Sequence, residues 1–337
     1  MSAPPNLHQR PSEEALIARY FAPLAGPAGL GLRDDAACLT PPPGHDLVVT
    51  KDALVAGVHF FADDPPDTIA QKALRVNLSD LAAKAAEPAG FLLGLALPHD
   101  WTEAWLAAFA NGLGEDAAMF ACPLLGGDTV ATPGPLTLSV TALGFVPCGQ
   151  MLRRQAAQPG DMLFVSGSVG DAALGLALRR PARDGHWARS LDATARAHLV
   201  ARYLLPQPRL ALREALRDHA HAAMDISDGL AGDCAKMLDG QGLTARIDLG
   251  RLPLSHAARA LLSAAPALME VAATGGDDYE ILCAVPEARA RDFVVAAKAA
   301  GTPVTAIGAV IEGDEPPQFL SPQGEPITFA RGSFSHF

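Results

Sequence analysis

The sequence predicts an α/β protein of two domains. Its 337 residues correspond to about two domains of roughly 150 residues each. Segments with the alternation of β-strands and segments with helical spacing follow one another along both halves of the chain. With 31 Gly and 28 Pro, the composition is typical of many turns rather than of a helical bundle. We therefore expect an α/β (α+β) fold in which each domain is a mixed sheet packed with helices.

In the first half, two helices are indicated most directly. Ser12, followed by two glutamates, is a typical N-cap and predicts a helix through Tyr20. Apolar residues recur at helical spacing over 70–86, and this helix should end near Pro88. The other elements expected here are strands at 46–50, 91–97, 124–125 and 136–145, and a helix over 102–120 capped by Thr102.

Turn residues between Cys148 and Asp161 predict the domain boundary, because Cys148-Gly149 and Pro159-Gly160 interrupt the regular patterns there. We place the N-terminal domain at 1–148 and the C-terminal domain at 149–337. In the second domain we expect a loop over 181–190, strands at 162–166, 223–226, 280–285 and 304–310, and helices at 171–180, 192–203, 209–219 and 287–300.

The charge balance excludes one class of partner. The chain has 26 Lys and Arg against 37 Asp and Glu, a formal net charge of −11. Affinity for nucleic acid comes largely from basic side chains, so we expect no nucleic-acid partner. A nucleotide is not excluded, because a bound metal ion can supply the positive charge.

The cysteines and the N-terminus indicate a cytoplasmic protein without a membrane partner. The five cysteines lie far apart and form no C-x-x-C, which is typical of reduced thiols and argues against a zinc site. The N-terminus has neither a basic start nor a long apolar run, so no signal peptide is predicted. The most apolar stretch, 91–98, is far shorter than the roughly 20 residues that span a bilayer.

Short segments rich in aspartate point to metal chemistry. Aspartates recur at the ends of apolar strands, beside Gly, Ser, Thr or another Asp. Mg²⁺ is usually held by one or two carboxylates together with waters and substrate phosphates. An ordinary turn explains any single segment better, since Asp and Gly are common turn residues. Six such segments together favour a metal site: 34–36, 50–52, 77–80, 126–129, 225–229 and 275–278.

Other nucleotide and calcium motifs are absent from the sequence. There is no G-x-x-x-x-G-K-[ST] and no protein-kinase H-R-D or D-F-G. The DISDG segment has Leu230 where a calcium loop needs Gly. The turn at 167–170 can cradle an anion at a helix start, although an ordinary strand-to-helix turn explains it better. His59, seven residues after Asp52, is expected to face the same cleft.

The motifs taken together resemble the thiamine-monophosphate kinase family, within the superfamily that includes aminoimidazole ribonucleotide synthetase. The most specific pieces are TKDALVAGVHF, KALRVNLSDLAAKAAEP, GGDT, DISDGL and GGDDYEIL. The resemblance runs from Leu16 to the C-terminal GSFSHF, so it covers nearly the whole chain.

This resemblance implies ATP-dependent phosphorylation of thiamine monophosphate to thiamine diphosphate with several Mg²⁺ ions, the final step of thiamine diphosphate biosynthesis. It also implies a homodimer that pairs through the N-terminal domain, with nucleotide and substrate meeting in a cleft. The implied metal ligands are Asp35, Thr50, Asp52, Asp80, Asp128, Asp225 and Asp228. The implied nucleotide contacts are Gly127, Asp128, Arg154 and Ser227, and the implied thiamine-phosphate contacts are His59, Asp277 and Phe334.

Four positions depart from the pattern of the family. Arg33 stands where Gly is usual, Lys51 where Thr or Ser is common, Lys84 where an apolar residue is usual, and Asp277 where Glu is frequent. A protonated lysine cannot ligate Mg²⁺, so Lys51 can act only through its carbonyl or as a counter-charge for phosphate. None of the departures removes a core carboxylate.

The chemistry requires two polyanions to meet. In the reaction that the resemblance implies, the nucleophile is a phosphate oxygen of the substrate, which is largely ionised at neutral pH because the second pKa of a phosphate monoester is about 6. Two like charges at about 4 Å repel by roughly 4 kcal/mol at an effective dielectric constant near 20. We expect Asp52, Asp80 and Asp128 to hold ions that offset this repulsion during direct in-line transfer, with Arg154 on the nucleotide phosphates and Phe334 stacked on a thiamine ring.

Two rival functions remain open from the sequence alone. One is a sister ATP-dependent synthetase that acts on another phosphorylated or acyl substrate. The other is a metal-loaded nucleotide sensor that uses the same aspartates without turnover. Formation of thiamine diphosphate from ATP, Mg²⁺ and thiamine monophosphate distinguishes them.

Overall fold

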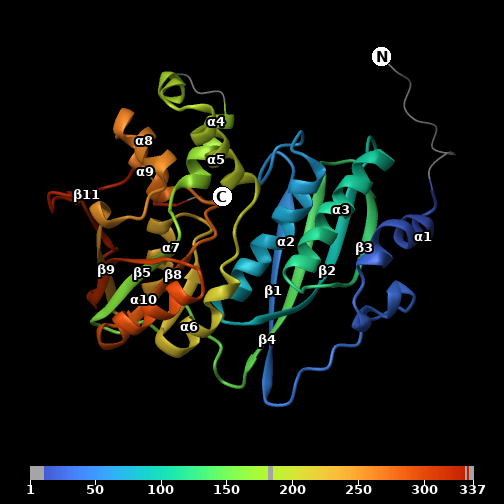
Figure 1. Ribbon diagram of the computed structural model, residues 1–337, viewed down its shortest axis with the longest axis horizontal. Coiled ribbons are helices and arrows are strands. Elements are labelled where there is room, and N and C mark those ends of the chain that lie inside the picture. Colours follow the sequence, from blue (N-terminus) through green and yellow to red (C-terminus); the bar gives the residue numbers. More distant parts are fainter. Residues whose placement is uncertain (1–10, 181–184, 331, 334–337) are drawn as a thin grey trace. The chain divides into compact units, whose positions relative to one another are not determined.

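The computed structural model describes residues 11–180, 185–330 and 332–333 (Figure 1). The chain divides into two compact units. Unit 1 contains residues 1–81 and 87–148, and unit 2 contains residues 82–86 and 149–337. Within the described residues, no helix combines the length and the apolar character that crossing a membrane requires.

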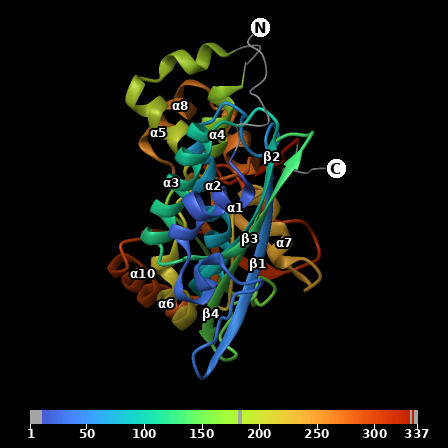
Figure 2. The ribbon, with the colours of Figure 1, turned by 90° about the vertical axis from the view of Figure 1, so that its right-hand side faces the viewer.

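Unit 1 is a four-stranded mixed sheet with helices on one face. Figure 2 shows its strands nearly edge-on, with helices α2 and α3 to one side. The sheet order is β1-β4-β2-β3, with β2 and β3 parallel and the other pairs antiparallel. Its elements are α1 (Glu13–Leu16), a π-helical turn (Ile17–Phe21), 3-10 turns (Ala22–Leu24 and Pro27–Leu32), β1 (His45–Val55), α2 (Pro66–Ala83), β2 (Glu87–Pro98), α3 (Glu103–Met119), β3 (Leu124–Thr132) and β4 (Thr137–Pro147).

The two faces of this sheet have different environments. Side chains of a strand alternate between faces, and along β4 every second residue from Leu138 to Val146 is buried. Along β1, Val48 and Leu54 are buried on the same face, while Leu47 and Val49 on the other face are 46% and 56% exposed. One face therefore packs on the helices and the other is open.

Helices α2 and α3 of unit 1 are joined by a buried ion pair. Arg75 donates from Nε to Asp116 Oδ2 at 2.6 Å and from Nη2 to Asp116 Oδ1 at 2.9 Å. Gln71 donates to the same carboxylate at 3.2 Å. The Asp116 side chain is fully buried and that of Arg75 is 7% exposed. Both charges are thus satisfied by each other rather than by water.

Unit 2 is a seven-stranded mixed sheet, in the order β11-β10-β7-β9-β5-β8-β6. Strands β7 and β10 are parallel, and the other pairs are antiparallel. Its strands are β5 (Asp161–Ser166), β6 (Ala222–Asp225), β7 (Leu243–Asp248), β8 (Ile281–Pro286), β9 (Val304–Glu312), β10 (Gln318–Leu320) and β11 (Pro326–Ile327). Its helices are α4 (Asp171–Arg179), α5 (Ala193–Leu204), α6 (Arg213–His219), α7 (Leu230–Leu238), α8 (His256–Ala264), α9 (Leu268–Thr274) and α10 (Ala290–Ala299).

The expected α/β class with a mixed sheet in each half is confirmed, as are both predicted helix caps. Ser12 accepts a hydrogen bond from Ala15 N–H, and Thr102 accepts one from Trp105 N–H. Two expectations are wrong. Residues Gly185–Ser190, expected to lie in a loop, form a 3-10 helix. The aspartates of the TKD and GGDT segments do not follow strands, because β1 continues to Val55 and β3 to Thr132. Lys51 and Asp128 lie in mid-strand on the open face of the sheet, whereas Asp52 lies in mid-strand on the same face as Val48 and Leu54.

Removing the Asp116 carboxylate should destabilise unit 1 strongly. Asp116→Ala leaves the Arg75 guanidinium buried without its partner, and loss of one member of such a pair costs about 3–5 kcal/mol. Chemical unfolding followed by tryptophan fluorescence measures this change.

The control for this variant is Arg19→Ala. Its ion pair with Glu103 spans 3.1 Å, and the two side chains are 65% and 45% exposed. Its loss should cost less than about 1 kcal/mol. Equal effects of the two substitutions would contradict the assignment of Asp116 as the buried anchor.

Candidate functional site

In unit 1, three of the predicted metal ligands lie where strand β1 meets helix α2. The Thr50 hydroxyl donates to Asp80 Oδ2 at 2.5 Å. The backbone N–H of Asp52 donates to the Asn77 side-chain oxygen at 3.1 Å, and Asn77 is fully buried. Two residues of a strand that lie two apart face the same side, so β1 presents Thr50 and Asp52 together toward α2.

The turn after β1 positions His59. Its Nδ1 accepts a hydrogen bond from Val55 N–H at 3.0 Å. The neutral ring therefore carries its proton on Nε2. The carbonyl of His59 accepts a hydrogen bond from the nearly buried Lys72 ammonium at 3.2 Å. The turn is thus fixed from both sides while the ring is only half-buried.

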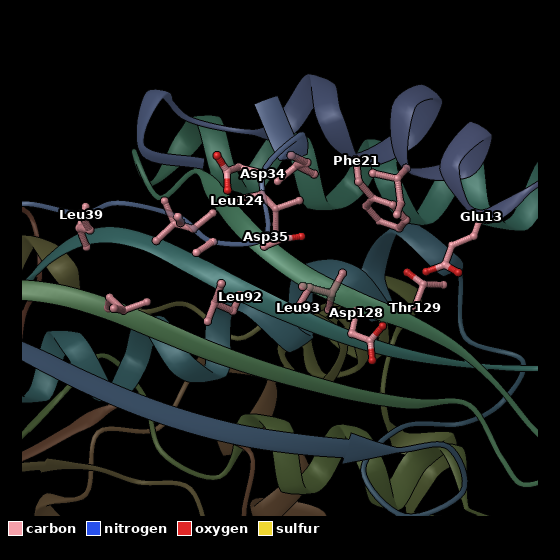
Figure 3. Close-up of a pocket in the computed structure, with 18 residues that line it drawn as sticks. Glu13, Phe21, Asp34, Asp35, Leu39, Leu92, Leu93, Leu124, Asp128 and Thr129 are labelled. Carbon is pink, nitrogen blue, oxygen red and sulfur yellow. The ribbon is translucent and has the colours of Figure 1, made fainter. Parts of the chain in front are cut away.

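A cavity of about 590 Å³ lies along β3 of unit 1 (Figure 3). Asp34 and Asp35, on the segment after the last 3-10 turn, line it together with Gly127 and Asp128 of β3. Apolar side chains such as Leu92 and Phe21 form the remaining wall, and Glu13 adds a further carboxylate. The described residues that line the cavity include no Lys, Arg or His. An acidic cavity of this kind is suited to cations.

Strand register separates the two groups of candidate ligands in unit 1. Asp52 pairs with Val140, Val140 with Leu93, and Leu93 with Gly127. Three strand spacings therefore lie between Asp52 and Gly127, which is about 14 Å at roughly 4.8 Å per spacing. The ligands at β1 and the ligands at β3 thus lie at opposite edges of one sheet and suit more than one ion.

In unit 2, the DISDGL segment is fixed by a buried aspartate that the sequence analysis did not single out. Asp233, in the first turn of α7, accepts hydrogen bonds from Ser227 N–H at 3.0 Å and from Asp228 N–H at 2.9 Å. Lys236 donates to Asp233 at 2.8 Å and to Asp228 at 2.5 Å. Burial lowers the pKa of Lys236, but its hydrogen bonds to both carboxylates outweigh burial and raise it. Lys236 therefore stays an ammonium that neutralises part of this loop.

The GGDDYE segment is hydrogen-bonded alongside the DIS segment. Asp277 N–H donates to the carbonyl of Ser227 at 2.9 Å, and Tyr279 N–H donates to that of Ile226 at 2.8 Å. A side chain at Gly276 would clash with the carbonyl oxygen of Ser227, so the two backbones approach this closely only with glycine there. Two predicted contact residues of unit 2, Ser227 and Asp277, are thereby brought together.

The turn at 167–170, for which an ordinary strand-to-helix turn was the better explanation, binds a carboxyl group of the protein itself. Asp278 accepts hydrogen bonds from Gly170 N–H at 2.6 Å and from Ala172 N–H at 3.3 Å, at the N-terminus of α4. Complete burial raises the pKa of Asp278 well above its ordinary value, although the hydrogen bond from Gly170 acts against burial. An internal carboxyl group thus takes the place that an external anion would occupy.

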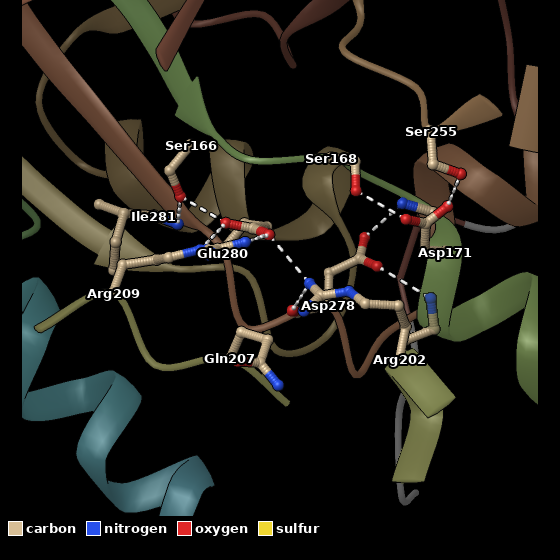
Figure 4. A network of polar contacts seen from close by, with 12 residues as sticks. Ser166, Ser168, Asp171, Arg202, Gln207, Arg209, Ser255, Asp278, Glu280 and Ile281 are labelled. Atoms are coloured by element: carbon tan, nitrogen blue, oxygen red, sulfur yellow. Dashed lines mark hydrogen bonds and ion pairs between the residues drawn. The ribbon is translucent and has the colours of Figure 1, made fainter. Parts of the chain in front are cut away.

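Glu280 is the second buried acid of the segment (Figure 4). Its Oε2 accepts hydrogen bonds from Ser166 Oγ and Arg209 Nε, both at 2.6 Å, and its Oε1 accepts one from Arg202 Nη2 at 2.9 Å. Nη2 of Arg209 also contacts Oε1. Burial lowers the pKa of Arg209, but the hydrogen bond and charge of Glu280 outweigh burial and raise it.

The remaining predicted residues are distributed as follows. Asp225 is the last residue of β6 and is buried, and Arg154 is exposed beside Arg153, which bridges to Ala222 of β6. Phe334 lies outside the described residues. Among the residues that the structure describes, no group of three or more His, Cys, Asp and Glu side chains is arranged to hold a metal ion. Mg²⁺ needs only one or two carboxylates besides water and phosphate, so the pairs present here are sufficient donors.

Four supporting residues were missed by sequence reasoning: Asn77, Asp233, Lys236 and Glu280. Most of their contacts are made only in the folded chain. Only Asp233 and Lys236, three residues apart on α7, have a helical spacing that offered a signal.

Comparison with known proteins identifies the family. Residues 33–146 match the N-terminal domain of AIR synthase related proteins, and residues 158–316 match the C-terminal domain of the same family. A thiamine-monophosphate kinase of Caulobacter vibrioides is 47% identical over 97% of this chain and 91% of its own length. The crystal structure of thiamine-monophosphate kinase from Stenotrophomonas maltophilia is 40% identical, with a TM-score of 0.78 over 88% of this chain and 91% of that one.

A solved complex of AaThiL with AMPPCP and TMP is also similar. It is 28% identical, with a TM-score of 0.73, and covers 90% of this chain and 91% of its own. Both sequence and fold agree over nearly the full length of these proteins. The chain therefore belongs to the thiamine-monophosphate kinase family, within the AIR synthase related proteins.

Proposed function

We propose that this chain uses ATP and Mg²⁺ to phosphorylate thiamine monophosphate to thiamine diphosphate, the final step of thiamine diphosphate biosynthesis. The observation that carries the proposal is the acidic cavity, which is lined by Asp34, Asp35 and Asp128 and has no basic side chain among its described lining residues. Relatives at up to 47% identity are thiamine-monophosphate kinases, and a similar solved structure holds AMPPCP and TMP.

We propose that oxygen donors of this chain hold several Mg²⁺ ions. Carboxylate and hydroxyl oxygens are the donors that Mg²⁺ prefers, and no thiolate or imidazole is among the proposed ligands. When bound, Mg²⁺ would neutralise phosphate charge. The proposed ligands are Asp35, Thr50, Asp52, Asp80, Asp128, Asp225 and Asp228, and of these Asp52, Asp80 and Asp128 are the proposed catalytic residues.

The protein's own groups would bind and orient the two substrates. The acceptor phosphate is already ionised at neutral pH, so the chain has no proton to remove. The nucleotide contacts in this proposal are Gly127, Asp128, Arg154 and Ser227. The thiamine-phosphate contacts are His59, Asp277 and Phe334. Positioning and charge neutralisation then supply the rate enhancement, as in other phosphoryl transfers.

The proposal also includes domain roles and a compartment. Domain 1–148 provides the metal and nucleotide site and the dimer contact, and domain 149–337 provides the DISDG and GGDDYE segments. A cytoplasmic location agrees with the use of ATP and with five cysteines that have free thiols.

We expect the purified protein, with ATP, Mg²⁺ and thiamine monophosphate, to form thiamine diphosphate, measured by chromatography of the products. Asp128→Asn should lower kcat by about 100-fold or more, because it removes the charge of a proposed metal ligand. Asp128 is exposed, so its replacement should leave the packing of the core unchanged.

The matched control is Asp100→Asn, an exposed aspartate in the turn before α3, which should keep the wild-type rate. ATP binding without any product would favour a nucleotide sensor, and product from thiamine itself would indicate a different kinase. Unchanged activity of Asp128→Asn would remove that residue from the site.

Direct in-line transfer predicts net inversion at the transferred phosphorus, because a single displacement inverts that centre. ATP made chiral at the γ-phosphorus with oxygen isotopes, followed by stereochemical analysis of thiamine diphosphate, measures the outcome. Net retention would require two displacements and a phosphoenzyme, which the proposal does not contain.

The open face of the unit 1 sheet supports a homodimer. Val49 and Leu47 of β1 are 56% and 46% exposed, Val130 of β3 is 48% exposed, and Leu92 of β2 is 39% exposed. Exposed apolar residues that gather on one face are typical of protein contacts. A second copy of the chain presents the same apolar face and can cover it.

Val49→Asp should therefore shift the protein toward the monomer, because it places a charge on the proposed contact. Size-exclusion chromatography with light scattering measures the mass. Val295→Asp on α10, where the native side chain is 62% exposed, is the control and should leave the mass of the wild type unchanged. A dimeric Val49→Asp variant, or a monomeric wild type, would contradict the proposed interface.

A further inference from the structure

The segment Gly275–Glu280 contains two buried acids that alternate with two half-buried residues. Asp278 and Glu280 are fully buried, whereas Asp277 and Tyr279 are partly exposed. Asp277 has a φ of +72° and Tyr279 a φ of +50°, in the left-handed region that non-glycine residues rarely adopt. The segment therefore keeps this conformation only because its surroundings enforce it.

The first restraint is the contact of Asp278 with α4. Its two carboxylate oxygens accept the N–H groups of Gly170 and Ala172, more than 100 residues away in sequence. Gly170 is the N-cap of the nine-residue helix α4 and Ala172 lies in its first turn, where the helix dipole favours a negative charge. Asp278 faces into unit 2, so it is held by the protein and is not a substrate ligand.

The second restraint is the arginine pair around Glu280. Arg202 of α5 donates to Glu280 and also, at 3.3 Å, to the backbone carbonyl of Asp278. Arg209 adds its guanidinium fork to the same carboxylate (Figure 4). Charge-assisted and forked contacts of this kind fix orientation as well as distance. Both ends of the left-handed stretch are thus tied to helices α4 and α5.

The neighbouring nucleotide segment has an anchor of its own. Asp233 holds the backbone of Ser227 and Asp228 through hydrogen bonds of 3.0 and 2.9 Å. Loss of Asp278 therefore removes one restraint on Asp277 and Tyr279, while the contacts of Asp233 with Ser227 and Asp228 stay in place. The two segments remain joined by the backbone hydrogen bonds from Asp277 to Ser227 and from Tyr279 to Ile226.

We propose that Asp278 and Glu280 are positioning residues that hold Asp277 in place for the thiamine-phosphate substrate. This inference rests on the function proposed above. Asp277 supplies the contact, and the two buried acids fix the backbone that carries it. Because neither buried acid touches substrate, their replacement should act on substrate affinity through geometry alone.

The test compares Asp278→Asn with Asp161→Asn in the full-length protein. Each carboxylate oxygen of Asp278 accepts one helix N–H group, and asparagine replaces one of these oxygens by an NH₂ group, which opposes the N–H that it faces. Asp161, the first residue of β5, is the matched control because it is a buried acid of the same unit, 2% exposed. It accepts hydrogen bonds from Gln158 N–H at 2.9 Å and from His221 at 3.0 Å.

We expect Asp278→Asn to raise the KM for thiamine monophosphate about tenfold or more, with the KM for ATP changed by less than about twofold. Asp161→Asn should lower Tm and leave both KM values unchanged. Hydrogen exchange at the amides of Asp277 and Tyr279 should accelerate in Asp278→Asn and not in Asp161→Asn. This measurement does not depend on enzymatic activity.

An unchanged KM for thiamine monophosphate in folded Asp278→Asn, or an equal rise in Asp161→Asn, would overturn the positioning role. If Asp278→Asn does not fold, Arg209→Lys takes its place, because it keeps the positive charge but loses the forked contact with Glu280. A rise in the KM for thiamine monophosphate in this variant would support the positioning role, and an unchanged KM would overturn it. A wild type that forms no thiamine diphosphate would instead overturn the proposed function, so the two failures are distinguishable.

Discussion

The structure depends on a single electrostatic constraint: a carboxylate removed from water must find its hydrogen-bond donors within the protein. In unit 1, Asp116 meets this condition with Arg75 and joins α2 to α3. In unit 2, Glu280 meets it with two arginines and a serine, and Asp278 with the N-terminus of α4. Each of these acids joins elements that are distant in sequence. In unit 1 the joined elements are the two helices that pack on the sheet, and in unit 2 they are the GGDDYE segment and helices α4 and α5.

The acids of the cavity have the opposite environment. Asp34, Asp35 and Asp128 are exposed, and the described lining of the cavity offers them no basic side chain. Asp228 is intermediate, because Lys236 donates to it while more than a third of its side chain stays exposed. Acids whose donors come from the fold maintain structure, whereas acids that face water without a cation retain the capacity to bind one.

Local patterns were sufficient for much of the fold. The Thr102 cap and the helical spacing over 70–86 are properties of neighbouring residues, and α3 and α2 occur there. The strand ends were misjudged because Lys51 and Asp52 were taken to close a strand that continues to Val55. Lys51 lies on the open face of the sheet and Asp52 on the face of Val48 and Leu54, and this placement is decided by packing that no local pattern contains. The candidate ligands were found as a set, but their division between the two sheet edges follows from strand order.

The GGDDYE segment shows why the rest of the site could not be predicted from the sequence. Asp277, Asp278 and Glu280 are similar acids within four residues, yet only Asp277 is partly exposed. What separates them is the position of Gly170, Ala172, Arg202 and Arg209, which reach them only in the folded chain. The formal charge of −11 combines both kinds of acid. Because Glu280 and Asp116 are already neutralised by arginine, the negative field that an incoming phosphate meets comes from the exposed acids of the candidate site, and that local charge, rather than the total, is what bound cations must offset.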